Sequence, residues 1–448
     1  MHTERLPRTI GLFSAIAVIV GTTIGSGIFR VPATVAARLG EPGPIMLAWV
    51  LGGALALFGA LTLAELAAMS PRSGGIFAYL EEAFGPVPAF LFGWSQLSVI
   101  RASALGGIST IFAEYLGYFV PLGGQVTVLG LQLGGVNLAA AATILVVALI
   151  NYLGVKYAAS VMGVATIAKY VGMVGLVILA FAAGQGNWGN FTSSGVTPFS
   201  ISMVASALVS IMWAYDGWAD LSFIGGEIKN PGRNFPLALI IGTILIILIY
   251  LLLNAAYIYL VPVPEMAGQK LIAATAAGRI PLLGGAGAAI VSAIVMISCF
   301  GTLNGSMLTN PRIFFAMADR GLFFKGVARV SPRFQTPSVA IWLAASLGCG
   351  YVLFNDFQQL ADRFVLGIWP FYILAIWGVF VLRRRSPNAE RPYRTIGYPV
   401  VPIIFLLAAV GMVINALVTD PVNTGVTFGI LLLGLPLYYL TIGRRRAS

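Results

Sequence analysis

Two glycines interrupt a long apolar stretch near the N-terminus, at Gly25-Ser26-Gly27. Glycine costs about 1 kcal/mol relative to alanine inside a helix, and a Gly-x-Gly step can unwind the helix and leave backbone N–H groups without intrahelical partners. At bilayer depth such groups are tolerated only where they are buried in protein or line a cavity. A helix that restarts at Ile28 would direct its positive N-terminal end at the same place, which predicts a carboxylate site. The alternative is close helix packing at Gly21, Gly25 and Gly27.

A second apolar stretch, Ile201 to Ile224, contains Asp216 and Gly217 in its middle. A carboxylate and a glycine both disfavour an unbroken membrane helix, so we predict a second break here. Lys169 lies in the middle of a third apolar stretch, where a charge costs at least about 2.5 to 3.5 kcal/mol. We expect its side chain to face the protein interior, with a lysine that extends to the membrane surface as the alternative.

The composition requires a membrane protein. Of 448 residues, 58% are hydrophobic and 9% are charged, whereas soluble domains carry about 25% charged residues. The net charge of +11 does not indicate nucleic acid binding, because the basic residues fall on alternate loops. Cys299 and Cys349 lie in apolar stretches and His2 is the sole histidine, so we expect no metal site, no disulfide framework and no cofactor.

Windows of about 20 apolar residues divide the chain into twelve spans. They are Ile10 to Leu39, Gly43 to Met69, Phe84 to Phe119, Asn137 to Leu153, Ser160 to Ala183, Ile201 to Ile224, Pro236 to Val261, Leu282 to Met317, Val339 to Phe354, Phe364 to Leu382, Pro399 to Val418 and Thr424 to Ile442. An even number of spans with basic tails and basic even-numbered connections predicts that both termini are cytoplasmic. No cleavable signal-peptide pattern precedes the first span.

The two breaks also predict the internal organisation of the single domain, residues 1–448. They lie in spans one and six, five spans apart, so the second half enters the membrane from the opposite side. We therefore expect two inverted repeats, 10–183 and 201–382, with a binding site near the membrane midplane, followed by a peripheral pair of helices at 399–442. The connection Met69 to Phe84 is interpreted as a turn, and Arg320 to Pro337 as a short interfacial helix or a solvated loop.

Four motifs resemble those of the L-type amino acid transporters, within the amino acid-polyamine-organocation superfamily. They are Val20-Gly21-Thr22-Thr23-Ile24-Gly25-Ser26-Gly27-Ile28-Phe29 with Pro32, Trp213-Ala214-Tyr215-Asp216-Gly217-Trp218 with Glu227 and Asn230-Pro231, Phe300-Gly301-x-x-Asn304-Gly305 with Arg312, and Arg391-Pro392-Tyr393-Arg394 with Gly397, Pro399 and Pro402. The resemblance implies an all-α fold of about twelve transmembrane helices, with five-plus-five inverted repeats, broken helices 1 and 6 and two extra helices. It also implies alternating-access transport of amino acids.

The resemblance further implies a substrate site at the two breaks. Backbone N–H groups would hold the substrate carboxylate at Ile24, Gly25, Ser26 and Gly27, and backbone carbonyls would hold its ammonium at Trp213, Ala214 and Asp216, beside Gly217. These donors and acceptors match the two poles of a zwitterion. Trp213 would close over the substrate from outside, with Tyr215 beside it. Asp216 either admits cationic as well as neutral substrates or caps a helix N-terminus.

By the same resemblance, Lys169 would take the place of the ion of sodium-coupled relatives. It would contact backbone carbonyls near Gly21 to Ile24, and Ser298 would complete the contact from the eighth span. A lysine that releases its proton there would instead carry a coupled proton. Arg101 matches a basic residue of the family and is expected in structural or gating contacts. The usual following proline is Ala102 in this chain.

The sequence thus predicts a sodium-independent exchanger of neutral L-amino acids, and the role of Asp216 leaves open whether cationic ones are also substrates. The alternatives are a proton-coupled symporter and a polyamine or amine carrier. A channel would need a ring of charges, and an enzyme would need a catalytic motif such as GxSxG, a metal cluster or a P-loop, none of which the chain has. The loop Val120 to Val136 lacks the cysteine that links family members to a heavy chain. We therefore expect no such partner, and a prokaryotic inner (plasma) membrane location.

Overall fold

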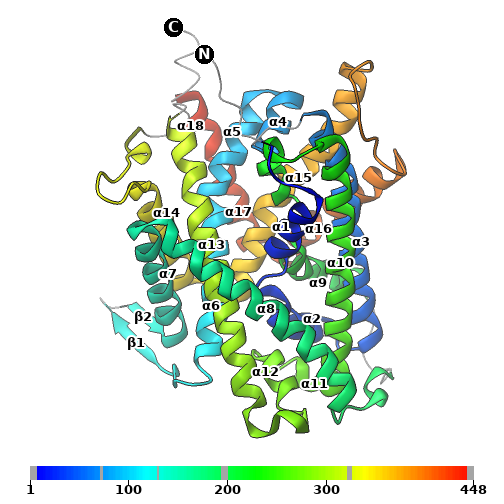
Figure 1. Ribbon diagram of the computed structural model, residues 1–448, viewed down its shortest axis with the longest axis vertical. Coiled ribbons are helices and arrows are strands. Elements are labelled where there is room, and N and C mark those ends of the chain that lie inside the picture. The colour runs from blue at the N-terminus through cyan, green and yellow to red at the C-terminus, as the bar shows by residue number, and fades with distance from the viewer. Residues whose placement is uncertain (1–7, 71–73, 129–130, 193–199, 320–324, 441–448) are drawn as a thin grey trace.

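The computed structural model describes residues 8–70, 74–128, 131–192, 200–319 and 325–440. Almost all of its regular structure is helical, and most helices run along the long axis of the molecule (Figure 1). We call the end with Arg383, Arg384 and Arg385 the basic end, and the other end, with the short helices α11 (Val263–Met266) and α12 (Ile272–Ala277), the opposite end.

The first pass is broken, as the glycines predict. Helix α1 (Leu12–Thr23) ends before Ile24, a single 3-10 turn covers Gly27–Phe29, and helix α2 (Val31–Leu39) continues the pass. The helix therefore restarts at Val31 and not at Ile28. Arg30 has a non-helical backbone, and proline in the first turn of α2 needs no N–H partner there.

The sixth pass is also broken. Helix α9 (Ile201–Tyr215) ends where Asp216 adopts an extended conformation with ψ of 148°. Gly217 follows with φ of 119°, which is open to glycine and strained for other residues. The second half of the pass is a 3-10 segment, Asp220–Glu227, and not a resumed α-helix.

The remaining passes are continuous or nearly so. They are formed by α3 (Pro42–Met69), α5 (Pro86–Ser95) with α6 (Arg101–Leu116), α7 (Gly135–Leu153), α8 (Val155–Ala183), α10 (Pro231–Leu260), α13 (Gly287–Asp319), α14 (Ser338–Phe354), α15 (Phe357–Arg385), α16 (Val400–Thr419) and α17 (Pro421–Leu432) with α18 (Gly434–Tyr438). Over the described residues, eight of the segments are long and apolar enough to cross a membrane by length and composition. The shorter apolar helices include α1, α14 and the Ile167–Ala183 part of α8. The prediction of a polytopic all-α membrane protein is confirmed.

Several connections contain more structure than the apolar pattern predicts. Helix α4 (Ile76–Phe84) lies within the segment interpreted as a turn, and the strands β1 (Gln125–Val128) and β2 (Leu131–Gly134) form an antiparallel hairpin in the loop after the third pass. Lys325–Ala328 forms a 3-10 turn, and the preceding residues 320–324 of the basic connection lie outside the described residues. Further 3-10 turns cover Trp188–Phe191 and Pro281–Ala286.

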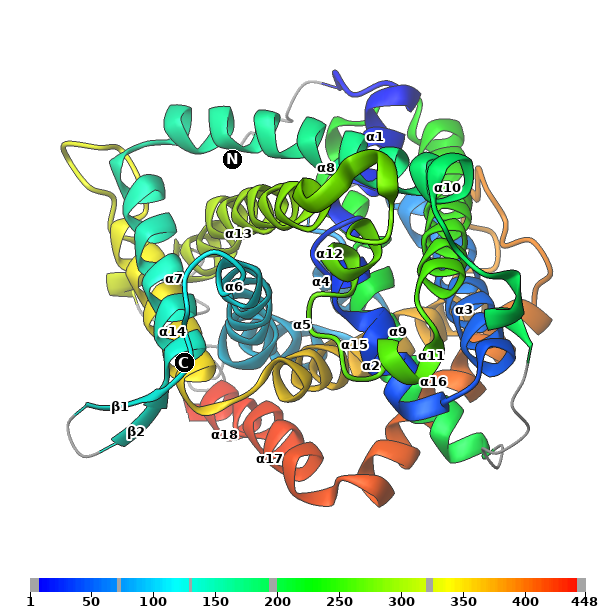
Figure 2. The same cartoon turned by 90° about the horizontal axis from the view of Figure 1, so that it is seen from below.

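The breaks of the two interrupted passes are buried inside the bundle. Helix α1 packs on α10, α2 packs on α9, and α13 packs on α6 and α8. Seen from below, α17 and α18 lie at the edge of the molecule (Figure 2). Helix α16 exposes apolar side chains such as Leu407 and Val418, as a lipid-facing helix must. The division into the inverted repeats 10–183 and 201–382 stays a prediction.

Candidate functional site

The two breaks touch each other directly. A Cβ atom added to Gly27 would lie 2.8 Å from the Cα atom of Ala214, and one added to Gly217 would lie 2.7 Å from the Cα atom of Thr23. Real side chains do not approach backbone this closely, so both glycines are needed for the crossing. The ends of α1 and α9 therefore meet in the middle of the bundle.

A cavity of about 90 Å³ lies at this crossing. Five helical passes contribute to its wall, which combines backbone of the two breaks with charged, hydroxyl and aromatic side chains. The lining residues are Thr22, Thr23, Gly25, Ser26, Gly27, Arg101, Ala104, Ile108, Trp213, Asp216, Gly217, Asp220, Thr302, Ser306 and Phe364. Of the predicted substrate-binding residues, Gly25, Ser26, Gly27, Trp213, Asp216 and Gly217 are brought together here.

The first break supplies free hydrogen-bond donors. The carbonyls of Ser26 and Gly27 accept from the N–H groups of Phe29 and Arg30, at 3.2 and 3.1 Å. The N–H groups of Ser26 and Gly27 themselves have no acceptor among the described residues. A buried N–H group normally has a partner, so these two donors are available to an anionic ligand in the cavity.

The second break supplies acceptors. A helix leaves its last carbonyls without intrahelical partners, and within the described part of the chain no N–H group donates to the carbonyls of Trp213 or Asp216. The negative end of the α9 dipole reinforces them. The cavity thus has donors on one side and acceptors on the other, which matches the carboxylate and the ammonium of an amino acid.

Asp216 ends a helix and does not cap the start of one. Its Oδ1 accepts a hydrogen bond of 2.8 Å from the hydroxyl of Tyr372, and the N-cap of the following 3-10 segment is Ala219, without a side-chain cap. The capping alternative for Asp216 is therefore wrong. Asp220 and Arg101 line the same cavity, so its side chains carry two carboxylates and one guanidinium.

Arg101 follows a π-helical turn, Gln96–Ile100, and its Nε donates to Oε1 of Gln96 at 2.7 Å. Single π-turns inside α-helices occur frequently at functional sites. The sequence placed Arg101 in structural or gating contacts, whereas the structure places it in the cavity wall.

Ile24, Ala214 and Tyr215 lie behind the cavity wall. The carbonyl of Ala214 accepts a hydrogen bond of 2.9 Å from the hydroxyl of Tyr250, which also lies 3.1 Å from the carbonyl of Thr23. One hydroxyl thus connects the two breaks. The Tyr215 hydroxyl donates to the carbonyl of Trp49 at 3.2 Å, away from the cavity.

Lys169 is 4% exposed and lies behind the first break. Its Nζ donates to the carbonyl of Gly21 at 3.0 Å and to that of Ile24. Ser298 is buried outside the cavity wall, and its hydroxyl oxygen has no hydrogen-bond partner in the part of the chain that the structure describes. The structure thus places Lys169, but not Ser298, in contact with the first break.

The cavity is closed toward the opposite end. The indole of Trp213 is 8% exposed and meets the rings of Phe357 and Phe364 edge-on, at 5.8 and 5.0 Å between centroids. Beyond it, Arg30 pairs with Glu114 at 2.9 Å. Thr22 is exposed on the other side of the cavity, toward the basic end. Trp213 and the Arg30–Glu114 pair thus close the cavity toward the opposite end.

Sequence reasoning missed Asp220, Tyr250 and Tyr372. Asp220 has a readable signal, because it follows Asp216 by four residues in an apolar segment, where carboxylates are expensive. The two tyrosines have none: their hydroxyls gain partners only through the packing of distant helices. Over the described residues, no group of three or more His, Cys, Asp or Glu side chains is placed to hold a metal ion.

Residues 10–441 match the amino acid permease family. The chain is 33% identical to the serine/threonine exchanger SteT of Bacillus subtilis, over 100% of both chains. It is 35% identical to the human b(0,+)-type amino acid transporter 1 over 94% of this chain and 84% of the relative, and 32% identical to the human cystine/glutamate transporter over 98% and 86%.

These relatives are membrane transporters, so the chain is a multi-pass amino acid transporter and not an enzyme. The sequence-based resemblance to the L-type amino acid transporters is confirmed. The chain belongs to the amino acid permease family, within the amino acid-polyamine-organocation superfamily.

Proposed function

We propose that this protein is a sodium-independent exchanger of neutral L-amino acids that works by alternating access. The observation that carries the proposal is the pairing of unused N–H donors at Ser26 and Gly27 with unused carbonyls at Trp213 and Asp216 around one cavity. The substrate carboxylate binds the donors, and the substrate ammonium binds the acceptors. Because both poles are held by backbone, the substrate side chain is left to set selectivity.

The cavity favours small neutral amino acids. Its volume is about 90 Å³, and the walls that a side chain would meet include Ile108, Thr302 and Phe364. The bacterial relative is named as a serine/threonine exchanger, which supports substrates of this size. An amine that lacks the carboxylate would leave the donors of Ser26 and Gly27 unpaired, so a polyamine or amine carrier is the weaker proposal.

Cationic substrates are a second candidate. The side chains of Asp216 and Asp220 face the cavity with Arg101 as the lining cation, which leaves one carboxylate in excess. A substrate with a basic side chain balances this charge. We expect cationic amino acids to compete with neutral ones, and Asp216→Asn to weaken that competition more than neutral transport.

Sodium independence rests on Lys169. Its ammonium group already occupies the carbonyl oxygens of Gly21 and Ile24, and oxygen atoms of this kind are the ligands that a hard cation such as sodium would need. A fixed charge at this place couples no ion to transport. Proton symport is the alternative, with Lys169 as the group that gains and loses the proton.

For orientation, we propose that the basic end faces the cytoplasm, because arginines and lysines concentrate on that side of membrane proteins. The structure then represents an inward-facing conformation, closed outside by Trp213. We also propose that the protein works in the cell membrane without a disulfide-linked heavy chain.

The test is uptake of radiolabelled L-threonine into sodium-free proteoliposomes that contain either buffer or unlabelled L-threonine. We expect uptake only with internal amino acid. Equal uptake into buffer-filled vesicles under an inward proton gradient would refute exchange and support proton coupling. L-Lysine and ethanolamine serve as competitors: competition by L-lysine that is lost in Asp216→Asn supports the cationic site, and competition by ethanolamine contradicts the carboxylate site.

A further inference from the structure

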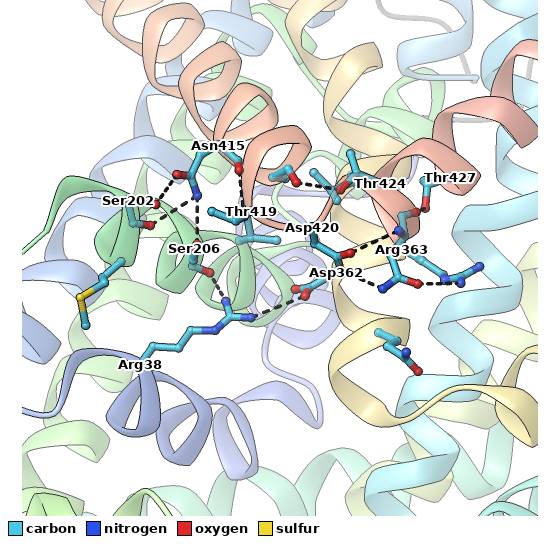
Figure 3. Close-up of a pocket in the computed structure, with 16 residues that line it drawn as sticks. Arg38, Ser202, Ser206, Asp362, Arg363, Asn415, Thr419, Asp420, Thr424 and Thr427 are labelled. Atoms are coloured by element: carbon cyan, nitrogen blue, oxygen red, sulfur yellow. Dashed lines mark hydrogen bonds and ion pairs between the residues drawn. The ribbon is translucent and has the colours of Figure 1, made fainter.

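A second and larger pocket lies near the opposite end, away from the crossing of the breaks. Its volume is about 430 Å³, and α2, α9, α15, α16 and α17 form its walls (Figure 3). The lining residues are Arg38, Ser202, Met203, Ser206, Val209, Gln359, Asp362, Arg363, Leu366, Asn415, Ala416, Thr419, Asp420, Asn423, Thr424 and Thr427. None of them lines the central cavity, so amino acid binding between the breaks does not account for this pocket.

Of the two arginines in the pocket, Arg363 is the one that has too few hydrogen-bond and ion-pair partners. Its NH2 group donates to Oδ1 of Asn423 at a long 3.3 Å, and its Cζ lies 6.0 Å from the ring centre of Tyr351. Its Nε is buried and has no hydrogen-bond partner among the described residues. No carboxylate forms an ion pair with Arg363 among the described residues. A buried charged donor without a partner is costly, so its surroundings favour an anionic group from a ligand.

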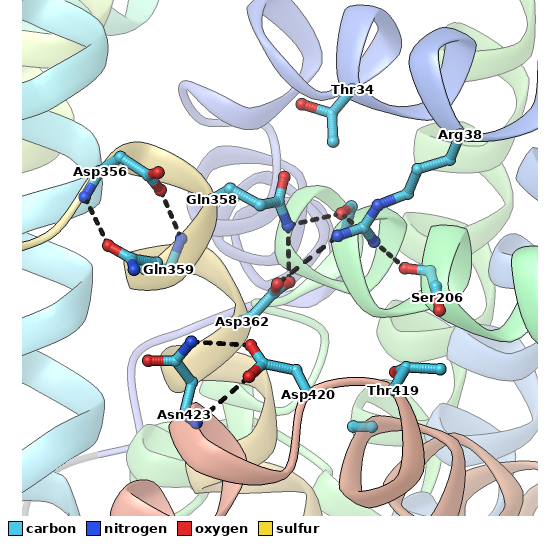
Figure 4. Close-up of polar contacts among 12 residues, drawn as sticks. Thr34, Arg38, Ser206, Asp356, Gln358, Gln359, Asp362, Thr419, Asp420 and Asn423 are labelled. Atoms are coloured by element: carbon cyan, nitrogen blue, oxygen red, sulfur yellow. Dashed lines mark hydrogen bonds and ion pairs between the residues drawn. The ribbon is translucent and has the colours of Figure 1, made fainter.

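Arg38, by contrast, is well paired. It forms an ion pair of 3.5 Å with Asp362 and donates to the carbonyl of Ser206 and to Oγ of Ser210 at 3.0 Å. Figure 4 shows Arg38 reaching Asp362 from α2. The free anion-binding capacity of the pocket is therefore at Arg363 and not at Arg38.

Carboxylates lie close to Arg363. Asp420 accepts from the backbone N and the Nδ2 of Asn423, at 3.3 and 2.8 Å, and the same Asn423 side chain accepts from Arg363. One asparagine thus separates an unsatisfied guanidinium from a carboxylate. Asp362 adds a second carboxylate, and Met203, Val209 and Leu366 add an apolar wall.

We propose that this pocket binds a zwitterionic ligand, with the anionic group at Arg363 and the ammonium group at Asp420 and Asp362. Two sources carry this chemistry: a free amino acid, or the headgroup of an ethanolamine phospholipid. Val418 and Val422, which flank the Asp420 turn, are 74% and 73% exposed and would border the acyl chains of a lipid.

The placement predicts an effect on transport. The walls join α2 and α9, which belong to the broken passes, to α15, α16 and α17. A ligand that bridges them stabilises the conformation in which this end is closed, and a ligand that prefers one conformation shifts the population toward it. Bound ligand therefore slows exchange without competing at the central cavity. This effect, unlike the binding itself, rests on the proposed function.

The binding test uses the full chain in detergent. O-phosphoethanolamine, which has neither a carboxylate nor acyl chains, is titrated while the thermal unfolding midpoint is measured. Vesicles of dioleoylphosphatidylethanolamine form a second series. We expect at least tenfold weaker binding in Arg363→Gln and in Asp420→Asn, where asparagine still caps α17. Arg384→Gln removes an exposed guanidinium from the basic end of α15 and should bind as the unaltered chain does.

A second measurement identifies the source. Equilibrium dialysis with radiolabelled L-threonine should give two bound molecules per chain, and one in Arg363→Gln, if a free amino acid is the ligand. The lipid is the ligand if the unaltered chain and Arg363→Gln each bind one L-threonine and the phospholipid raises the thermal unfolding midpoint of the unaltered chain alone. The proposal is wrong if Arg363 and Asp420 affect none of three measurements: binding of a second L-threonine, binding of phosphoethanolamine and binding of the phospholipid. Failure of exchange with intact phosphoethanolamine binding would count against the transport proposal alone.

Discussion

At the opposite end, two ion pairs join the broken first pass to its neighbours, whereas the ion pairs found at the basic end among the described residues join unbroken elements. Arg30 comes just before the start of α2 and pairs with Glu114 of α6. Arg38 lies in the last turn of α2 and pairs with Asp362 of α15. At the basic end, Glu65 of α3 pairs instead with Arg383 of α15 and with Arg391 beyond it.

Glu65, Arg383, Arg391 and Thr395 form a cluster around a buried carboxylate, which we call the Glu65 cluster. The Glu65 side chain is fully buried, and its oxygens accept from two guanidinium nitrogens of Arg383, at 2.8 and 2.7 Å. The N–H and hydroxyl groups of Thr395 also donate to it, at 2.8 and 2.7 Å. No residue of α1 takes part. The contrast teaches that the charges of the first pass at the opposite end are placed to act as a gate, while those of the Glu65 cluster hold unbroken elements together as a frame.

The largest effect is expected from Glu65→Gln. It leaves Arg383 and Arg391 without their anion, and breaking a buried pair costs about 3–5 kcal/mol. We expect a large loss of apparent thermal stability and of monodisperse protein in detergent. Glu82→Gln, which neutralises an exposed carboxylate of α4 at the same end, should change stability by less than about 0.5 kcal/mol. Equal melting of the two variants would contradict a frame role for Glu65.

Trp213→Ala should abolish closure of the central cavity toward the opposite end while leaving the Glu65 cluster intact. The indole covers the cavity through edge-on contacts with Phe357 and Phe364, so its loss exposes bound substrate to the opposite end. We expect kcat/KM for exchange to fall at least about tenfold, which corresponds to about 1.4 kcal/mol of transition-state stabilisation. Trp188→Ala removes an exposed tryptophan and is the matched control. Unchanged exchange by Trp213→Ala would refute the gate.

Glu114→Gln tests the first ion pair of the gate. The paired side chains are only 15% and 7% exposed, so the interaction is partly shielded from water. The assay uses a background in which both cysteines are replaced by alanine and Ser26→Cys is added. In this background we expect Glu114→Gln to make Cys at position 26 react about five- to tenfold faster with an impermeant thiol reagent applied from the opposite end. This corresponds to a shift of about 1–1.4 kcal/mol in the free energy of opening. Arg30→Gln should do the same, and the double variant should exceed neither single change by much. Additive effects would mean that the two residues act separately.

Asp362→Asn should have the smallest effect. The Arg38–Asp362 pair spans 3.5 Å with both side chains 26% exposed, and Arg38 keeps its bonds to Ser206 and Ser210. Such pairs contribute about 0.2–1 kcal/mol, so the same thiol assay should show at most a severalfold change that is smaller than that of Glu114→Gln. The reverse order would place the main lock at Asp362.

The sequence predicted where the backbone breaks but less well what surrounds the breaks. Gly27 and Gly217 are locally readable, since glycine in an apolar run is costly wherever it lies. Lys169 is readable for the same reason. The restart of the first pass at Val31 was missed because Arg30 takes its non-helical backbone from its place between the 3-10 turn and α2, which local propensity does not encode.

The partners of the site could not be predicted, for a physical reason. Tyr250 and Tyr372 lie in apolar helices in which any aromatic residue would satisfy the hydrophobic pattern, and their hydroxyls reach Thr23, Ala214 and Asp216 only after α10 and α15 have packed. The hairpin β1–β2 could not be predicted from long apolar runs, because Gln125–Val128 is too short to form one.

The two glycine contacts at the crossing also restrict how this transporter can diversify. Since Gly27 lies against Ala214 and Gly217 against Thr23 with no space for a methyl group, substitutions at these contacts are unavailable to selection or to design. Variants with altered substrate size must therefore arise on the other walls, at positions such as Ile108, Thr302 and Phe364. A mutational library confined to those walls would test for new specificities while keeping the backbone of the crossing unchanged.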